Sequence, residues 1–277
     1  MSRTSRTILV TGSSGGLGRA VAEYFAGHDG WNVAATMRDT AKGGVFSDMH
    51  NVGVFELDVT RPETVRAAVE ETVATFGRVD VLFNNVGYGG LLAFEETADE
   101  SFRRAFETNF FGHLEVMRAV LPVMRAQRSG FIINVTSLAG LFGIPLQSAY
   151  CASKFAMTGF TETVKWELAS QGIDATVLEV GGMKTEFAAH MTNSREVPIG
   201  DYDAYMRRMI PAIETATKRF QANAVGPVEV ASSVYRLVHM KRKPFRYHPT
   251  RDGKIIGVLK RLLPDRVFRK VSAMGLD

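Results

Sequence analysis

The sequence has 277 residues, of which 45% are hydrophobic. This length suffices for one large α/β domain with a sizeable core, and we expect a single domain over 1–277. The single cysteine, Cys151, excludes an internal disulfide framework and a cysteine-rich zinc site. No apolar stretch approaches about eighteen residues, and the first residues lack the features of a secretory signal. We therefore expect a cytoplasmic protein without a membrane-spanning helix.

Positive charge is concentrated near the C-terminus. The net charge is +4, yet 241–270 holds eleven lysines and arginines against two aspartates, which gives +9 there and −5 in the rest. Such a stretch can attract nucleic acid or anionic lipid, but it is more often a solvated surface. We expect 241–277 to be a basic C-terminal extension that does not bind nucleic acid. A peripheral membrane contact through 241–270 is the disfavoured alternative.

Apolar, β-rich runs alternate with helix-length segments over most of the chain. Several runs are apolar without alternating, as strands covered by helices on both faces should be. This order predicts an α/β protein with a doubly wound parallel sheet of the Rossmann type, about seven strands with helices on both faces. The predicted strands are 7–12, 31–36, 52–59, 79–87, 130–137, 173–180 and 245–248, and the predicted helices include 61–76, 98–127 and 148–171.

The pattern changes after residue 185. A methionine-rich, charged segment predicts a substrate-capping helical unit over 186–225, and a helix that begins at Gly226-Pro227 follows it to residue 240. The last predicted helix, 254–263, has a broad apolar face, which we expect to pack on its own domain.

The first strand ends in the glycine-rich turn TGSSGGLG, residues 11–18. Glycines let backbone amides approach a pyrophosphate, and the N-terminus of the following helix adds partial positive charge. Such a turn alone is weak evidence, but this one lies between the first strand and first helix of a repeated β/α pattern. We therefore predict that it holds a dinucleotide, through Gly12, Ser14, Gly16, Leu17 and Gly18.

The end of the second strand indicates which dinucleotide is bound. An acidic residue there would bind the 2′-hydroxyl of the adenosine ribose, whereas an arginine would accommodate a 2′-phosphate. The sequence reads Ala-Thr-Met-Arg over 35–38, with no acid before Arg38. We predict NADP(H), with NAD(H) as the alternative. A surface pair of Arg38 with Asp39 is the interpretation without a ligand.

Further motifs, in the same order, resemble the short-chain dehydrogenase/reductase family over nearly the whole chain. The turn at 11–18 is similar to that family's TGxxxGxG loop, NNVG at 84–87 to its NNAG segment, and YCASK at 150–154 to its YxxxK motif. Val86 replaces the alanine of NNAG, and Val180 replaces the proline of the PG segment, which we expect to loosen the loop after the sixth strand. The resemblance implies a catalytic set of Asn109, Ser137, Tyr150 and Lys154, and further cofactor contacts from Asp58, Val59, Asn85, Val86, Gly87, Tyr150, Lys154, Gly182, Met183 and Thr185.

These residue types suit proton transfer at a carbonyl oxygen. Tyr150 and Lys154 are four residues apart, so they share one face of the predicted helix. A free phenol has a pKa of about 10, and a nearby ammonium favours its ionised form. Tyr150 would donate its proton in the reductive direction, and Ser137 would hydrogen-bond the same oxygen. By resemblance, Asn109 helps a water to connect Lys154 to solvent.

The predicted activity is that of an NADP(H)-dependent short-chain alcohol dehydrogenase or carbonyl reductase. An NADP(H)-binding regulator or sensor without turnover is the alternative. No HExxH or comparable histidine pair occurs, so we expect no metal site. The resemblance implies a homodimer or homotetramer that pairs through 98–127 and 148–171. We expect a hydrophobic carbonyl or alcohol substrate because the regions predicted to contact it are rich in apolar residues: Leu138, Leu141, Phe142, Ile144, Leu146, Phe187, Met191 and Met206.

Overall fold

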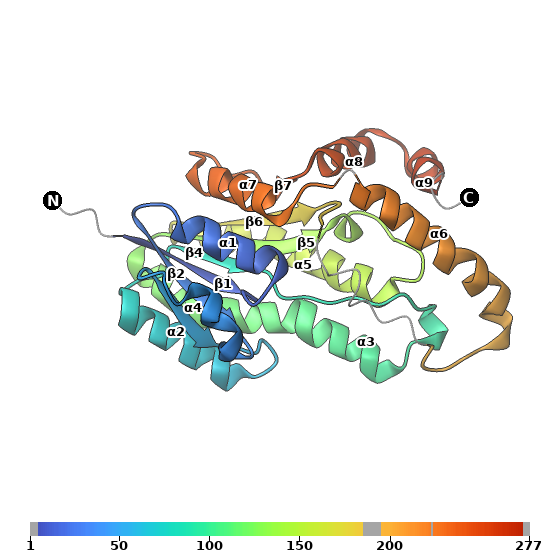
Figure 1. Ribbon diagram of the computed structural model, residues 1–277. Helices are drawn as coiled ribbons and strands as arrows, with labels where there is room; N and C mark the ends of the chain where they lie inside the picture. Colours follow the sequence, from blue (N-terminus) through green and yellow to red (C-terminus); the bar gives the residue numbers. More distant parts are fainter. Residues whose placement is uncertain (1–4, 185–194, 223, 274–277) are drawn as a thin grey trace.

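The computed structural model describes residues 5–184, 195–222 and 224–273. Strands and helices alternate along the chain (Figure 1). The strands are β1 (Arg6–Thr11), β2 (Trp31–Met37), β3 (Val52–Glu56), β4 (Val81–Asn84), β5 (Gly130–Ser137), β6 (Ile173–Val180) and β7 (Arg246–Tyr247). The helices are α1 (Gly16–Ala26), α2 (Pro62–Phe76), α3 (Asp99–Phe106), α4 (Gly112–Gln127), α5 (Ser148–Ala169), α6 (Asp203–Ala222), α7 (Pro227–His239), α8 (Arg251–Leu262) and α9 (Asp265–Ala273).

The described strands form one parallel sheet in the order β3-β2-β1-β4-β5-β6-β7. The chain first builds outward from β1 to β3 and then resumes on the other side of β1 with β4. Ligands of such sheets bind outside the carboxyl ends of the strands at this switch point. The predicted doubly wound parallel sheet is confirmed, and the switch point lies between β1 and β4.

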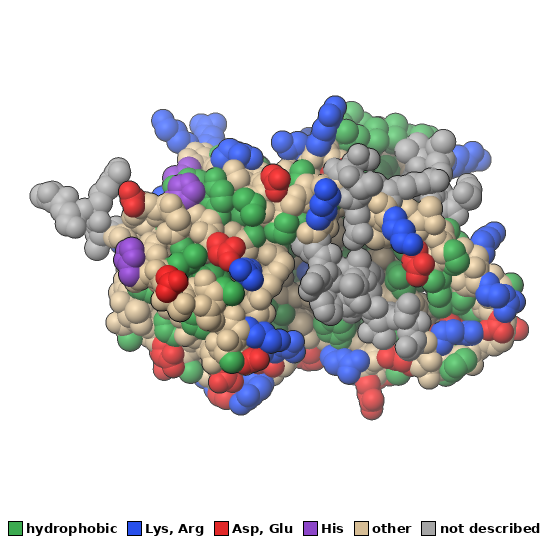
Figure 2. Space-filling view, in the orientation of Figure 1, with side chains coloured by type: hydrophobic (Ala, Val, Ile, Leu, Met, Phe, Trp, Pro, Cys, Tyr) green, Lys and Arg blue, Asp and Glu red, His purple; other side chains and the backbone are tan. Residues whose placement is uncertain are grey.

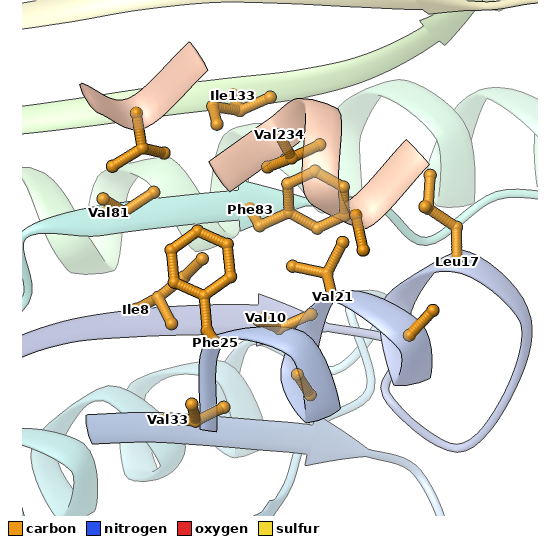
Figure 3. Close-up of a cluster of buried hydrophobic side chains, with 14 of the residues drawn as sticks. Ile8, Val10, Leu17, Val21, Phe25, Val33, Val81, Phe83, Ile133 and Val234 are labelled. Atoms are coloured by element: carbon orange, nitrogen blue, oxygen red, sulfur yellow. The ribbon is translucent and has the colours of Figure 1, made fainter. Parts of the chain in front are cut away.

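Two hydrophobic cores cover the two faces of the sheet. Successive strand residues point to opposite faces, so Ile8 belongs to one core and Leu9 to the other. Helices α1 and α7 cover one face, and α2, α4 and α5 cover the other. Figure 3 shows the first core, built by four strands and two helices from Ile8, Val10, Leu17, Val21, Phe25, Val33, Val81, Phe83, Ile133 and Val234. Each such side chain, when fully buried, contributes about 1.5–3 kcal/mol.

Three predicted elements differ from the observed ones. The strands predicted over 52–59 and 79–87 are too long, since β3 ends at Glu56 and β4 spans only Val81–Asn84. After β3 the carboxylate of Asp58 accepts hydrogen bonds from the amide and the hydroxyl of Thr60, which turns the chain toward α2. The predicted uniform helix 98–127 is also wrong, because a π-helical turn, η3 (Glu107–Phe111), separates α3 from α4.

The C-terminal helix α8 is oriented differently from our expectation. We expected the apolar face of 254–263 to pack on its own domain, but Ile255, Val258 and Leu262 are each more than half exposed. The helix is held instead by its glycine side: a Cβ at Gly257 would lie 2.4 Å from Nε2 of His248. This close contact turns the apolar residues outward.

The capping segment predicted over 186–225 is described from residue 195. Met206, Met209 and Ile213 of α6 pack against Leu91 and Leu146, which lie in the loops after β4 and β5. Its first described residues are fixed by Glu96 of the turn η2 (Phe94–Glu96), whose buried carboxylate forms an ion pair with Arg195. The same carboxylate accepts a hydrogen bond from the amide of Ile199 at 3.0 Å. Helix α6 thus covers the carboxyl-end loops.

Candidate active site

The glycine turn forms a close crossing between β1 and α1. Gly12 has a φ of +74° and Gly16 a φ of +54°, values that favour glycine. A Cβ at Gly18 would lie 2.2 Å from the carbonyl oxygen of Gly12, so only glycine lets the helix approach the strand this closely. Leu17 is buried beneath the turn, whereas Ser14, Gly15 and Gly16 are exposed.

This turn fits the pyrophosphate of a dinucleotide. The N-cap of α1 is a glycine, so no side chain caps the first amides of the helix. These amides and the helix dipole favour an anion. The exposed backbone of Ser14, Gly15 and Gly16 lets an anion reach these amides.

The segment 84–87, at the carboxyl end of β4, lies directly beside the turn. The amide of Asn85 donates to Oγ1 of Thr11 at 2.8 Å, and Nδ2 of Asn85 donates to the carbonyl oxygen of Thr11 at 3.0 Å. A Cβ on Gly12 would lie 3.1 Å from a methyl group of Val86, the residue that replaces the alanine of the family pattern. The structure thus brings Asn85 and Val86 to the switch point.

Arg38 and Asp58 lie at the ends of the neighbouring strands. Arg38 is exposed and directly follows β2. The carboxylate of Asp39 accepts from the amide of Ala41 at 3.1 Å, and no ion pair of the described residues joins it to Arg38. Asp58 is half-buried, and the buried Val59 that follows it packs against Gly112 of α4.

Ser137, Tyr150 and Lys154 converge at the carboxyl end of β5. Ser137 ends the strand, and its Oγ accepts from the amide of Ala139 at 3.2 Å. Tyr150 and Lys154 share the inner face of α5 and are 9% and 3% exposed. The ammonium of Lys154 lies 5.7 Å from the centroid of the Tyr150 ring and donates to the carbonyl oxygen of Val135 at 3.0 Å.

Burial dominates the electrostatics of this group. It raises the pKa of Tyr150 to about 12, while a hydrogen bond from Ser137 acts in the opposite direction. Burial also lowers the pKa of Lys154 to about 8. Burial is thus the largest influence on the pKa of Tyr150, which is raised in the folded protein. At neutral pH the phenol carries its proton, as a proton donor must.

The π-helical turn η3 carries Asn109 into the same region. Nδ2 of Asn109 donates to the carbonyl oxygen of Tyr88 at 2.9 Å and to Oγ of Ser153 at 3.1 Å, and Oδ1 accepts from the amide of Tyr88 at 3.0 Å. A Cβ at Gly87 would lie 3.2 Å both from Oδ1 of Asn109 and from Nζ of Lys154. Gly87 thus keeps open the space between these two side chains, and π-helical turns often occur at functional sites.

Two supporting residues, Ser153 and His113, were not predicted from the sequence. Ser153 donates to the carbonyl oxygen of Tyr150 at 2.8 Å while it accepts from Asn109. Nε2 of the buried His113 donates to the carbonyl oxygen of Val86 at 2.6 Å. Burial, with a smaller effect of the Lys154 charge, lowers the pKa of His113 to about 3, so the ring is neutral. The sequence could have pointed to His113, because it follows Asn109 by four residues and the two then share one face of the helix.

The loop after β6 is held by helix α8 and by the segment that precedes α7. The amide of Gly182 donates to Oδ2 of Asp252 at 2.8 Å, and Met183 forms a parallel bridge with Val225. The loosening that we expected from Val180 is therefore countered by contacts with distant residues. Thr185, the predicted contact to the nicotinamide, lies outside the described residues.

A pocket opens beside Tyr150. A Cβ at Gly89 would lie 3.2 Å from the Tyr150 ring, so the glycine lets the loop after β4 approach the phenol. The lining combines apolar and polar side chains: Leu92, Leu146, Thr97, Ser101, Arg104, Gln147 and Glu196. The predicted apolar contribution of Leu146 is thus accompanied by polar groups from α3 that we did not anticipate. Among the described residues, no cluster of three or more histidine, cysteine or acidic side chains could hold a metal ion.

Comparison with known proteins identifies the family. The sequence model described as short chain dehydrogenase matches residues 6–196. The chain belongs to this family. It is 33% identical over 268 residues to 3-ketodihydrosphingosine reductase of Bacteroides thetaiotaomicron, across 95% of this chain and 94% of that protein. Retinol dehydrogenase 8 of Bos taurus is 33% identical over 261 residues, across 89% of this chain and 82% of the relative.

Two solved structures share the fold. A short-chain dehydrogenase from Streptomyces avermitilis has a TM-score of 0.79 and 29% identity, and the match covers 98% of both chains. The structure of ElxO with NADP bound has a TM-score of 0.70 and 27% identity, over 88% of this chain and 95% of that one. The predicted family is confirmed, and the chain is an oxidoreductase of that family.

Proposed function

We propose that this short-chain dehydrogenase interconverts a hydrophobic ketone or aldehyde and the corresponding alcohol, with NADP(H) preferred over NAD(H). The observation that carries the proposal is the convergence of Ser137, Tyr150 and Lys154 beside the glycine turn. A protonated phenol, a hydroxyl and a buried ammonium at one point suit the reduction of a carbonyl group. Two relatives named for retinol and 3-ketodihydrosphingosine, both lipophilic compounds, support the substrate class.

Different residues would bind different parts of the cofactor. When bound, the cofactor supplies a hydride for the carbonyl carbon. The turn at 11–18 would hold the pyrophosphate through its backbone amides. Arg38 would meet a 2′-phosphate, Asp58 the adenine, and Lys154 the ribose next to the nicotinamide.

Proton transfer belongs to the side chains at the end of β5. Tyr150 gives its proton to the substrate oxygen as the carbon is reduced, and Ser137 donates a hydrogen bond to the same oxygen. The charge left on Tyr150 is stabilised by the Lys154 ammonium. The pKa of Lys154, about 8, lets this group exchange a proton near neutral pH more readily than an ordinary lysine. Asn109 holds the backbone of Tyr88 and so maintains the opening at Gly87 next to Lys154.

The catalytic assignment is tested by Tyr150→Phe. NADPH oxidation is followed with a panel of lipophilic ketones and aldehydes, and cofactor binding is followed by NADPH fluorescence. We expect kcat to fall by about 100-fold or more, since general acid catalysis contributes about 10²–10⁴-fold, while the Kd for NADPH changes less than about twofold. Tyr24→Phe, on α1, is the control. Equal rates for Tyr150→Phe and the wild type would refute the mechanism, and NADPH binding without turnover on any panel member would favour the sensor.

Cofactor preference is tested by Arg38→Leu. Loss of a charge-assisted contact to a 2′-phosphate should weaken NADPH binding by about tenfold or more and leave NADH binding within about twofold. Arg66→Leu changes an exposed arginine on α2 and serves as the control. An equal effect of Arg38→Leu on the binding of both cofactors would mean that Arg38 does not contact the 2′-phosphate.

We further propose a cytoplasmic homodimer that pairs through α4 and α5. Three large apolar side chains support the pairing: Phe111, which directly precedes α4, and Phe155 and Trp166 of α5 are 46%, 45% and 79% exposed. Trp166→Glu should shift the protein to monomers in sedimentation at micromolar concentration. A wild type that is monomeric at all accessible concentrations would contradict this part of the proposal.

A further inference from the structure

The outer sides of α8 and α9 form an amphipathic surface, here called the C-terminal surface. Its apolar members are Ile255, Val258, Leu262 and Val267, which are 52%, 55%, 72% and 44% exposed. The first three follow the spacing i, i+3 and i+7, so they form one stripe along α8. In Figure 2 hydrophobic side chains gather beside Lys and Arg at the upper margin, where Figure 1 places these two helices.

Basic residues border the stripe. Arg251, Lys254 and Arg261 are exposed on α8, and Arg266, Arg269 and Lys270 are exposed on α9. Over 251–270 the chain has seven lysines and arginines and only two aspartates. Both aspartates have partners within the protein, since Asp252 accepts from the amide of Gly182 and Asp265 pairs with Lys260. The surface therefore presents apolar side chains within a field of positive charge.

The combination of an apolar stripe and flanking cations indicates which kind of partner the C-terminal surface binds. A second copy of the same surface would bring like charges together, which opposes a symmetric pair. Nucleic acid would match the cations but not the apolar stripe. An anionic bilayer matches both, because acyl chains accept the apolar side chains and headgroups attract the cations. No helix among the described residues is long and apolar enough to cross a membrane, so such a contact would be peripheral.

The C-terminal surface also lies near the substrate side of the enzyme. Phe268 of α9 is buried and packs edge-to-face on Phe142, with ring centroids 5.2 Å apart. Phe142 belongs to the loop that follows Ser137, and α8 contacts the first turn of that loop, η4 (Leu138–Gly140). A membrane bound by this surface would therefore be adjacent to the loops around the pocket.

We propose that the C-terminal surface binds anionic phospholipid membranes, with α8 lying in the plane of the interface. The stripe enters the boundary between headgroups and acyl chains, and the flanking cations contact lipid phosphates. Membrane binding by this surface does not depend on the proposed function. A further consequence, that a lipophilic substrate would enter the pocket directly from the bilayer, does rest on the proposed function.

The first test uses flotation of the full chain with two kinds of vesicle, phosphatidylcholine alone and phosphatidylcholine with phosphatidylglycerol at a ratio of about 7:3. We expect binding to the anionic vesicles that weakens as NaCl is raised and that is at least tenfold weaker on phosphatidylcholine alone. The double variant K254Q/R261Q should lose roughly 25-fold in affinity, at roughly fivefold per charge. K42Q/R66Q changes two exposed basic residues elsewhere and should bind like the wild type.

A second test reports on the stripe itself. Val258→Trp places an indole on α8. The control, Val45→Trp, places one at a site of similar exposure, 42%, outside the C-terminal surface. Anionic vesicles should shift the added emission to shorter wavelength only for Val258→Trp, and circular dichroism checks that both variants are folded. Three outcomes overturn the proposal: no binding of the wild type to anionic vesicles, equal loss in K254Q/R261Q and K42Q/R66Q, or equal spectra for the two tryptophan variants. Self-association that is lost in K254Q/R261Q, without lipid binding, would assign the surface to a second copy and also overturn it.

Discussion

The buried ammonium of Lys154 should lower the free energy of unfolding relative to a variant with an uncharged side chain at this position. A lysine whose pKa falls from 10.5 to about 8 on folding destabilises the folded state by about 3 kcal/mol while it is protonated. Lys154→Met removes this penalty and loses one hydrogen bond, to Val135, worth about 1 kcal/mol. The variant should therefore be inactive and yet more stable by about 2 kcal/mol at pH 7, which corresponds to a rise in Tm of about 4–8 °C for a chain of this size.

The pH dependence gives the stronger check. Below about pH 8 the folded and unfolded states both bind the proton, and the wild type carries the whole penalty. Between about pH 8 and 10.5 the folded state releases the proton while the unfolded state keeps it, so wild-type stability rises with pH. The advantage of Lys154→Met should shrink over the same range in urea unfolding at pH 6–10. A variant that is less stable at every pH, or whose advantage is the same at pH 7 and pH 10, would refute the reasoning; Lys42→Met is the exposed control.

Three further substitutions or modifications follow from the site. Gly18→Ala should weaken cofactor binding by about tenfold or more in fluorescence titration because it drives the helix from the strand, whereas Gly44→Ala, with open space around the site, should not; equal affinities would contradict the close crossing. Glu96→Gln weakens the ion pair with Arg195 and should raise KM about threefold or more with a smaller change in kcat. An unchanged KM would show that the capping segment does not contribute to substrate binding. Because Cys151 is buried and its thiol pKa is raised, iodoacetamide should modify it at least about 100-fold more slowly in the folded than in the unfolded protein; comparable rates by mass spectrometry would contradict this burial.

The parallel sheet was predictable because its strands are buried on both faces. Runs such as Phe131–Ile133 are then consecutive apolar residues instead of alternating with polar ones, and the helices between the strands make the chain order recognisable. The ends of strands were less predictable, since they depend on side chains that compete with the ladder. Asn84 is the last residue of β4 because the next residue, Asn85, bonds to Thr11 of another strand.

The composition of the candidate site was visible in the spacing of its motifs, but its energetics were not. A separation of four residues places Tyr150 and Lys154 on one face, yet says nothing of how deeply that face is buried. The burial that raises the pKa of Tyr150 and lowers that of Lys154 comes from packing across the whole fold. The contact of Gly112 with Val59, at the end of the π-helical turn, also joins segments far apart in the sequence.

The orientation of α8 shows the same limit. The sequence revealed an apolar face but not which side of the helix the domain would use. Gly253 and Gly257 decide this, because their missing side chains allow the close approach to Thr250 and His248. A pattern of hydrophobic residues alone favours burial of those residues, and here two glycines outweigh it.

The hydrogen bond from Gly182 to Asp252 joins parts of the chain that are 70 residues apart. A shortened protein that ends after α7 would keep the glycine turn, Ser137, Tyr150 and Lys154, and would still match the family over 6–196. It would lack the carboxylate that fixes the loop after β6. Fusion partners and deletions at the C-terminal end should therefore be treated as changes to the active site, and late truncating mutations as candidates for loss of function despite an intact catalytic motif.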